Sequence, residues 1–317
     1  MSSSSHSRRK FLVHFTAAAG VVLAALFCLC GNISLAQVQT GEGKSTFSSS
    51  QKPVMEPIKT DTPNVVTQDG KQAGERIVLT VKGVEYPFRW CPAGTFTKGS
   101  PESEPGRSSD ETQHEVRLTQ GFWMLETQVT QEMWESVTGE NPSYFKDSKK
   151  LPVEQVSWND CQEYIKKLNA MNSAPKGYKF SLPTEAQWEY ACRAGTKTAL
   201  NHGKNLTDEE YNCPNLYEVG WYDWQNKETK THEVGGKKPN AWNLYDMHGN
   251  VWEWCSDWYG DYRVMDPVGP STGSDRVLRG GGWSNFAEGC RSASRYYYGP
   301  SYRSYDVGLR LSLVREK

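Results

Sequence analysis

The eight residues from Asp246 to Glu253 form the clearest pattern in this chain for holding a hard cation. They read Asp-Met-His-Gly-Asn-Val-Trp-Glu. Calcium takes several oxygen ligands and accepts both carboxylates and backbone carbonyls. The pattern therefore predicts a structural calcium site made by Asp246, Gly249, Val251 and Glu253, which would pin loops that lack regular hydrogen bonding. In the alternative, Asp246 caps the turn and Glu253 pairs with an arginine.

Cysteine is the second residue type here that could do chemistry. Beyond the N-terminal segment the chain has six: Cys91, Cys161, Cys192, Cys213, Cys255 and Cys290. Outside the cytoplasm an even number permits disulfides, although sequence alone does not assign their pairing. Cys255 with Cys290 is the best single pair, and the alternative is separate buried thiols. No CxxC spacing occurs, so we do not expect a structural zinc site.

Three stretches resemble the formylglycine-generating, or sulfatase-modifying factor, family. They are Leu182–Tyr190 (LPTEAQWEY), Gly249–Cys255 (GNVWEWC) and the stretch from Arg279 to Ala293, with RGGGW at its start and CRSA at its end. The resemblance implies an α+β, irregular C-type-lectin-like fold with few helices, short strands and long loops. It also implies a calcium site on the Asp246–Glu253 turn.

The family's oxidation of a sulfatase cysteine to formylglycine uses copper held by two thiolates after the Arg-Gly-Gly motif. Cuprous copper prefers such a soft pair of ligands. Counting from Arg279, Asn285 stands where the resemblance places the first thiolate, and Cys290 stands near the second. A single thiolate cannot hold cuprous copper in that way. We therefore expect a non-catalytic scaffold, and a copper oxidase that uses Cys290 is the alternative.

The C-terminal segment 294–310 is rich in tyrosine and serine, with three consecutive tyrosines at 296–298. Antibody loops use these residue types, because tyrosine gives a large contact area at low entropic cost. Side chains alternate along a strand, so the three tyrosines cannot all face inward. The segment resembles the C-terminal end of lectin-fold variable proteins that retroelements diversify. The predicted ligand surface comprises Trp283, Ser284, Asn285, Phe286, Tyr296, Tyr297, Tyr298, Tyr302, Ser304 and Tyr305; in the alternative, the tyrosines pack on the core.

Capping and periodicity predict three helices in the middle of the chain. They begin after Thr130, Ser157 and Thr184, and the first ends at Gly139. A hairpin is expected from residues 77–81 to 88–90, across Gly83. Twelve tryptophans and 28 glycines favour a loop-rich domain whose core is filled by large rings. Beyond Gly195 we expect long irregular stretches with short strands.

The N-terminus has the features of an export signal. Arg8-Arg9 precedes an apolar run from Leu12 to Cys30, and Ser34-Leu35-Ala36 offers a cleavage site. A retained membrane anchor is the alternative. The predicted organisation is a signal or anchor over 1–36, a disordered linker over 37–76, and one domain over 77–317.

These features together predict an exported binding protein, monomeric, that contacts a protein or cell-surface ligand. The net charge of -1 does not favour nucleic acid as a partner. A formylglycine-generating oxidase is the second hypothesis. A carbohydrate-binding lectin ranks third, because the calcium turn leaves no open ligand position.

Overall fold

A five-stranded antiparallel sheet opens with the predicted hairpin. β1 (Arg76–Val81) turns through Lys82 and Gly83, both at positive φ, into β2 (Val84–Cys91). The sheet order is β1-β2-β5-β13-β6. Its other strands are β5 (Phe122–Leu125), β6 (Tyr178–Ser181) and β13 (Ser312–Arg315). The last strand of the chain thus lies between two earlier ones and joins the two ends of the domain.

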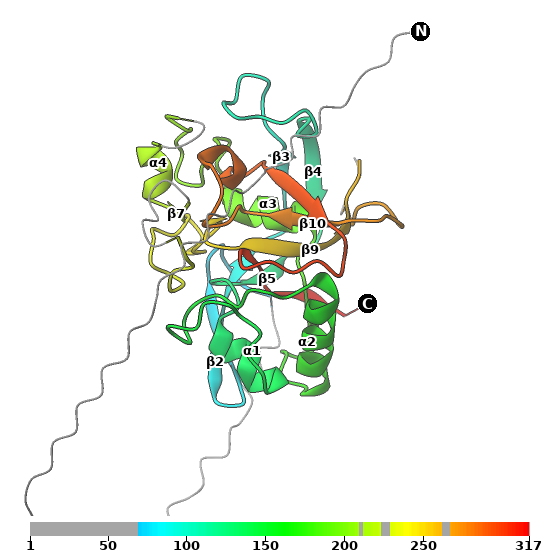
Figure 1. Ribbon diagram of the computed structural model, residues 1–317. Helices are drawn as coiled ribbons and strands as arrows, with labels where there is room; N and C mark the ends of the chain where they lie inside the picture. The colour runs from blue at the N-terminus through cyan, green and yellow to red at the C-terminus, as the bar shows by residue number, and fades with distance from the viewer. Residues whose placement is uncertain (1–68, 209–211, 223–228, 262–266, 317) are drawn as a thin grey trace, which may run out of the picture. The chain divides into compact units, whose positions relative to one another are not determined.

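The three predicted helices form, with the predicted caps. α1 (Gln131–Thr138) is capped by Thr130 and ends at Gly139, which adopts a left-handed conformation. α2 (Trp158–Ala170) and α3 (Glu185–Arg193) each begin with a capping box, at Ser157 and Thr184. Sequence reasoning did not place the short helix α4 (Pro214–Tyr217). α1 packs on β2 and α2 on β6, whereas α3 contacts β3, β9 and β10 (Figure 1).

A second sheet, of order β11-β10-β9-β12, carries the motifs from the last third of the chain. Its strands are β9 (Trp252–Trp258), β10 (Arg276–Arg279), β11 (Arg295–Tyr298) and β12 (Val307–Leu309). Two strand pairs complete the fold: β3 (Gly94–Lys98) with β4 (His114–Leu118), and β7 (Gly220–Trp221) with β8 (His248–Gly249). A 3-10 helix, η2 (Ala287–Cys290), precedes β11.

Among the described residues, three clusters of buried side chains make the core. The largest contains five tryptophans and lines the first sheet, α1 and α2. A second lies around Trp188 of α3, and a third includes Leu200, Leu216 and Ala287. Cys255 belongs to the second cluster and Cys290 to the third, and all six described cysteines are free. The pairing of Cys255 with Cys290 was therefore wrong, and buried thiols take its place.

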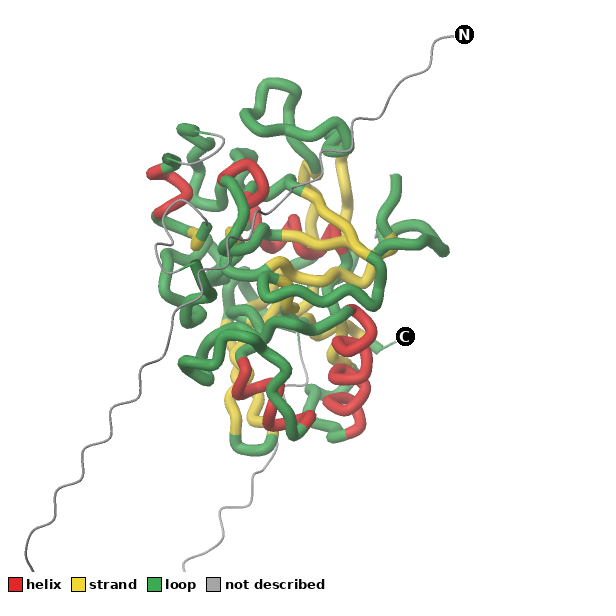
Figure 2. The backbone as a smooth tube through the Cα atoms, in the orientation of Figure 1, coloured by secondary structure: helices red, strands yellow, loops and turns green. Residues whose placement is uncertain are grey.

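This computed structural model describes residues 69–208, 212–222, 229–261 and 267–316. The predicted signal or anchor and most of the linker lie outside these ranges. The described chain begins within the predicted linker, where Asp69 pairs with Arg315 at 2.7 Å and Gly74 bonds to Trp90. Loops connect short strands through most of the domain (Figure 2), as expected for the α+β class. No helix among the described residues is long and apolar enough to cross a membrane.

Candidate functional site

The tyrosine-rich segment runs along β11, which is an edge strand of the second sheet as described, and continues to Val307. Tyr296, Tyr297 and Tyr305 are exposed, with 40%, 45% and 37% of their surface accessible. Tyr298 and Tyr302 instead stack on each other at 3.7 Å and pack against the largest core cluster. Three tyrosines thus face solvent, and two support the segment from within.

Trp283 is buried, with only 7% of its surface accessible. Its indole N–H donates to the carbonyl of Tyr305 at 3.2 Å, and its ring meets the edge of Phe145 at 5.8 Å between centroids. Direct contact of Trp283 with a ligand stays a prediction, and what the structure shows for this ring is a supporting position. The buried ring of Trp283 packs against the rings of Tyr305 and Phe145, and its N–H bonds to the backbone of Tyr305, so it holds both residues in place.

Asn285 is also a structural residue. Its side-chain oxygen accepts from the indole N–H of Trp252 at 2.8 Å and from the backbone N–H of Gly282 at 2.9 Å. These two bonds close the turn that follows the glycines of the Arg-Gly-Gly motif. The position that the family resemblance assigns to a copper thiolate therefore holds an amide that ties this loop to β9.

The predicted serines are joined through one carboxylate. The hydroxyls of Ser284 and Ser304 both donate to Asp306, one to each oxygen. Phe286 is half-buried at the start of η2. The two serines and Asp306 connect the Trp283 loop to the segment that carries Tyr305. Their hydrogen bonds position this part of the surface.

One exposed aromatic residue of this region was missed by sequence reasoning. Tyr144 has 71% of its surface accessible, and its ring contacts Phe145 at 5.0 Å. The sequence Asn-Pro-Ser-Tyr-Phe places two adjacent aromatics in a loop, which was the available signal. We call Tyr144, Tyr296, Tyr297 and Tyr305 the aromatic surface. Tyr144 is linked through Phe145 and Trp283 to Tyr305 by successive ring contacts.

The aromatic surface has two halves, one with Tyr296 and Tyr297 on β11 and one with Tyr144 and Tyr305. Trp252 connects the two. Its ring contacts Tyr296 at 5.5 Å, and its backbone N–H donates to the carbonyl of Asp306 at 2.7 Å, next to Tyr305. Tyr297 in turn contacts Tyr259 at 4.1 Å. The exposed rings are therefore held in place by other rings, so that little side-chain entropy remains to be lost when a ligand binds.

A shallow groove lies beside Tyr144. One part, of about 550 Å³, is lined by Pro142, Ser143, Tyr144, Lys146, Gln155 and Arg303. A second part, of about 360 Å³, shares Pro142, Gln155 and Arg303 and reaches Trp134 and α2. Arg303 stands between them, held by Asp160 through two bonds of 2.7 Å. The groove brings polar groups next to the exposed tyrosine.

The predicted calcium ligands do not all meet. Glu253 accepts two bonds from Arg310, at 2.8 and 3.0 Å, and one from the indole of Trp188 at 2.6 Å. Both partners and Glu253 are fully buried. Its carboxylate is thus occupied by an arginine, which is the alternative that the sequence left open for this residue.

Asp246 and the carbonyls do come together, around a residue that the sequence did not single out. The side-chain nitrogen of Gln128 lies 2.9 Å from the carbonyl oxygen of Val251 and 3.3 Å from those of Gly249 and Asp246. One carboxylate oxygen of Asp246 accepts from the N–H of Gly235 at 2.7 Å. Among described residues, no group of three His, Cys, Asp or Glu side chains is placed to hold a metal. Calcium at this turn stays a prediction.

Cys290, the catalytic candidate under the oxidase hypothesis, is fully buried. Burial raises the pKa of its thiol well above the usual value, and the neighbouring Cys213 acts in the same direction. Cys213 shares the third core cluster with it and is equally inaccessible. A protonated, inaccessible thiol is a poor metal ligand or nucleophile. Within the described part of the chain, neither cysteine lines the groove beside Tyr144 or the charged pocket at Arg295.

Buried ion pairs account for the charged residues of the other motifs. Arg279, which opens the Arg-Gly-Gly turn, donates to Glu189 of α3 at 2.6 Å and to the carbonyl of Ser292 at 2.7 Å. Arg295 binds Glu185 of the same helix. Gly281, at φ 76°, must be glycine because a Cβ atom there would lie 2.5 Å from the sulfur of Cys290. These motif residues connect α3 to the second sheet.

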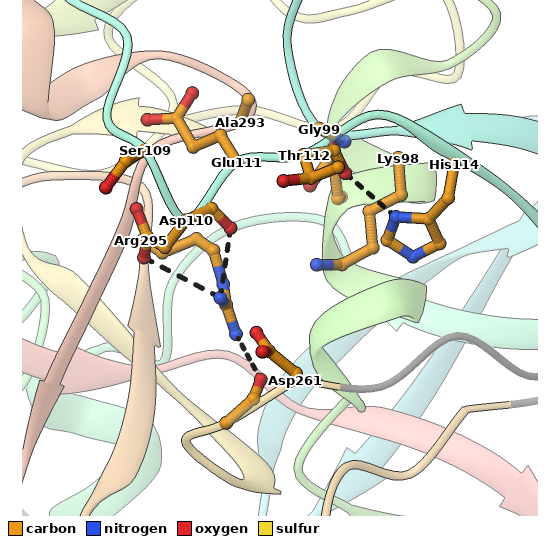
Figure 3. A pocket seen from close by; sticks show the side chains of 12 residues that line it. Lys98, Gly99, Ser109, Asp110, Glu111, Thr112, His114, Asp261, Ala293 and Arg295 are labelled. Carbon is orange, nitrogen blue, oxygen red and sulfur yellow. Dashed lines mark hydrogen bonds and ion pairs between the residues drawn. The ribbon is translucent and has the colours of Figure 1, made fainter.

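The charged pocket at Arg295 has a volume of about 300 Å³ and lies between β3 and β11 (Figure 3). None of the predicted ligand or metal residues is among its lining. Arg295 points into it and contacts Asp110 at 3.6 Å and the carbonyl of Gly260 at 3.1 Å. His114 turns to the carbonyl of Thr112 at 2.9 Å. Its charged groups mainly neutralise one another, so we place the candidate site at the aromatic surface.

The chain is similar in sequence to several known proteins. It is 32% identical over 243 residues to "Chaperone protein LppX" of Paenibacillus barcinonensis, which covers 62% of this chain and 80% of that protein. It is 35% identical over 173 residues to the formylglycine-generating enzyme of Streptomyces coelicolor, covering 50% of this chain and 51% of the enzyme. The chain thus spans about half the length of that enzyme.

Among solved structures, the variable protein 1 of Treponema denticola superposes with a TM-score of 0.66 at 32% identity, covering 75% of this chain and 98% of that one. Residues 87–316 match the model of the sulfatase-modifying factor enzyme 1-like domain. Both agree with the irregular α+β fold and with the motifs that build its core. The chain belongs to the sulfatase-modifying factor enzyme 1-like family.

Proposed function

We propose that this chain is an exported, non-catalytic binding protein that captures a protein or cell-surface ligand through the aromatic surface. The observation that carries the proposal is that exposed tyrosines are held in position by buried rings. Tyr305 stands on Trp283, and Tyr296 stands on Trp252. Rigid, exposed tyrosines are typical of binding sites, because they supply contact area without a large entropic cost.

The groove beside Tyr144 supports the same proposal. It offers the guanidinium of Arg303, the amide of Gln155 and the ammonium group of Lys146 next to an aromatic ring. Binding sites combine an aromatic centre with a polar rim of this kind. The ligand is expected to contact Tyr144 and Arg303 as well as β11, so that the interface extends across both halves of the aromatic surface.

The residues at the positions that the family resemblance assigns to copper thiolates also favour binding over oxidation. Asn285 uses its side-chain oxygen to hold Trp252 and Gly282, and Cys290 lies inside the core. The oxidase hypothesis requires two accessible thiolates in this region. The likeness to a protein named as a variable protein of Treponema denticola supports a display role for the scaffold. Export rests on the N-terminal sequence pattern.

The test replaces Tyr297 and Tyr305 together with alanine in the full chain. Surface proteins captured by the immobilised wild type would be identified by mass spectrometry, and the affinity of the purified partner would then be measured. We expect the double variant to lose at least about tenfold in affinity, because hot-spot residues, among which tyrosine is enriched, typically cost about 2 kcal/mol or more when they are truncated. Its melting temperature should stay close to that of the wild type.

The matched control is Tyr217→Ala, since Tyr217 is an exposed tyrosine on α4, with 51% of its surface accessible, outside the aromatic surface. This variant should bind the partner as the wild type does. Equal affinity of the double variant and the wild type would contradict the proposal. Unfolding of the double variant would also contradict it, because the tyrosines would then belong to the core.

The oxidase hypothesis is tested separately with a Cys-x-Pro-x-Arg peptide and with cuprous copper. We expect no formylglycine product and no stoichiometric copper binding that depends on Cys290. Copper binding by the wild type that disappears in Cys290→Ser would restore the catalytic hypothesis.

A further inference from the structure

Three backbone carbonyl oxygens point to one place inside the Asp246–Glu253 turn. They belong to Asp246, Gly249 and Val251, and all three lie within 3.3 Å of the same nitrogen atom. Left-handed backbone at Asp246 (φ 55°), Gly249 (φ 80°) and Asn250 (φ 68°) turns the chain so that these groups converge. Carbonyl oxygens carry partial negative charge, so their convergence requires a positive group between them.

This carbonyl cage is built by contacts that do not involve any metal. A Cβ atom on Gly249 would lie 1.9 Å from the carbonyl oxygen of Trp221, so only glycine fits there. The side chain of Asn250 exchanges two hydrogen bonds with the backbone of His232, at 3.0 and 3.1 Å. The backbone N–H of Gly249 donates to the carbonyl of Gly280 at 2.7 Å. The positions of the three carbonyls are therefore held by packing and hydrogen bonds of the surrounding backbone.

We propose that the side-chain amide of Gln128 takes the place of the calcium ion that the sequence pattern predicts, so that the turn closes without a metal. The amide nitrogen has two N–H donors, which it shares among three carbonyl acceptors. The opposite amide orientation would set an oxygen against three oxygens at 2.9–3.3 Å. That arrangement is repulsive unless a cation intervenes.

Two further observations agree with an amide in the cage. Gln128 is fully buried, so its amide has no access to water and must satisfy its donors within the protein. Glu253, the carboxylate expected to complete a calcium site, is neutralised by Arg310 instead. The oxygens that remain unpartnered near the cage are Oε1 of Gln128 and Oδ1 of Asp246. A cation that displaced the amide nitrogen would gain both oxygens as ligands, so calcium binding is the outcome that the experiment has to exclude.

The experiment measures thermal unfolding of the full chain with about 5 mM calcium or with a chelator, since even weak protein sites are filled at that concentration. We expect the melting temperature of the wild type to be the same in both. Gln128→Glu places a carboxylate against the three carbonyls. It should melt at a lower temperature in chelator and recover in calcium.

The matched control is Gln131→Glu. Gln131 is also buried, and its amide donates to two carbonyls, those of Phe145 and Pro152, at 2.7 and 3.3 Å. It lies in a different place, so calcium should not rescue this variant. Calcium titration by calorimetry provides a second readout on the wild type, with no binding heat expected.

A rise in the wild-type melting temperature with calcium, or stoichiometric calcium binding by the wild type, would overturn the proposal. Should Gln128→Glu fail to fold, Gln128→Leu decides. It removes the donors but keeps similar volume, and it should lower the melting temperature by roughly 5 °C in calcium and in chelator alike. An unchanged melting temperature for that variant would also overturn the proposal.

Discussion

The indole N–H of Trp252 donates to the side-chain oxygen of Asn285 at 2.8 Å, and this single bond joins two motifs that are 33 residues apart. Trp252 belongs to β9, which pairs in parallel with β12. Asn285 belongs to the loop after the Arg-Gly-Gly turn. The bond therefore fixes the loop that carries Trp283 against the sheet beneath the aromatic surface. The residue at the position that the family resemblance assigns to a copper thiolate thus supports the proposed ligand surface.

Replacing Asn285 with alanine should destabilise the protein, because the indole of Trp252 and the N–H of Gly282 both lose their acceptor. A buried donor without a partner costs about 1–3 kcal/mol. Asn285→Asp keeps an acceptor at the same place and should lose less. Urea unfolding at neutral pH measures both changes. Equal stability of the alanine variant and the wild type would show that this bond contributes nothing.

The Glu253–Arg310 ion pair should be far more sensitive to substitution than a surface pair. Both side chains are fully buried, and their atoms approach to 2.8 Å. Removing one partner leaves the other charge buried and uncompensated, which costs about 3–5 kcal/mol. We expect this loss for Glu253→Gln and for Arg310→Met in guanidinium unfolding. The double variant should lose less than the sum of the two, because neither charge remains unpaired.

Glu163 and Lys166 of α2 provide the control pair, since they lie 3.5 Å apart on the exposed face of the helix. Exposed pairs typically contribute about 0–1 kcal/mol, so Glu163→Gln should have little effect. Additive losses in the Glu253 and Arg310 double variant would mean that the two residues stabilise the fold through separate contacts.

The local elements of this fold were predictable from sequence because their signals lie within a few residues. Thr130, Ser157 and Thr184 each bond to a backbone N–H three residues ahead, so the sequence alone marks where α1, α2 and α3 begin. The hairpin of β1 and β2 was also predictable, because its turn depends on a local residue, Gly83, at positive φ. Tyrosine density also indicated the exposed segment, although not which tyrosines would turn inward.

The contacts that define the site could not be predicted, because they join residues far apart in the chain. The side-chain amide of Gln128 donates to the carbonyl of Val251, which lies 123 residues further along the chain, and no local sequence pattern predicts this bond. Tyr144 is linked to the Tyr305 region through Phe145 and Trp283, which are also distant in sequence from each other. Glu253 had two chemically reasonable partners, a cation or an arginine. Which of them it meets depends on how the connection between β12 and β13 brings Arg310 into the core, and this is a property of topology.

His248 should make stability depend on pH on the acid side. Its ring is fully buried; Nδ1 donates to the carbonyl of Cys290 at 2.6 Å, and Nε2 accepts from the N–H of Asn201 at 3.1 Å. Burial lowers the pKa of His248 to about 4. Its folded pKa thus lies below the unfolded value of about 6.5, so the stabilisation is complete above pH 6.5 and is lost as the pH falls towards 4. The loss amounts to about 3 kcal/mol.

Unfolding by urea at pH 7 and pH 4.5 measures this dependence. His248→Gln removes the titrating group, so the variant should lose less stability between the two pH values than the wild type does. Only the difference between the two proteins is informative, because the pKa of Asp246 is raised to about 6 by burial and acts in the opposite direction. Parallel pH profiles for the two proteins would contradict the prediction, because they would show that His248 takes up its proton as readily in the folded protein as in the unfolded chain.

The six cysteines from Cys91 to Cys290 should be reduced and unreactive in the folded protein. All six are buried and free, and burial raises the pKa of the thiols of Cys91, Cys161 and Cys255 well above the usual value. The thiolate is the reactive form, so both access and ionisation oppose alkylation. We expect iodoacetamide to label these positions only after unfolding, as peptide mass spectrometry would show.

A disulfide-linked peptide containing Cys213 and Cys290, which share one core cluster, would contradict this prediction. It would mean that these two thiols are oxidised to a disulfide when the protein is exported. In that case a reductant should lower the melting temperature, whereas we expect the reductant to leave it unchanged.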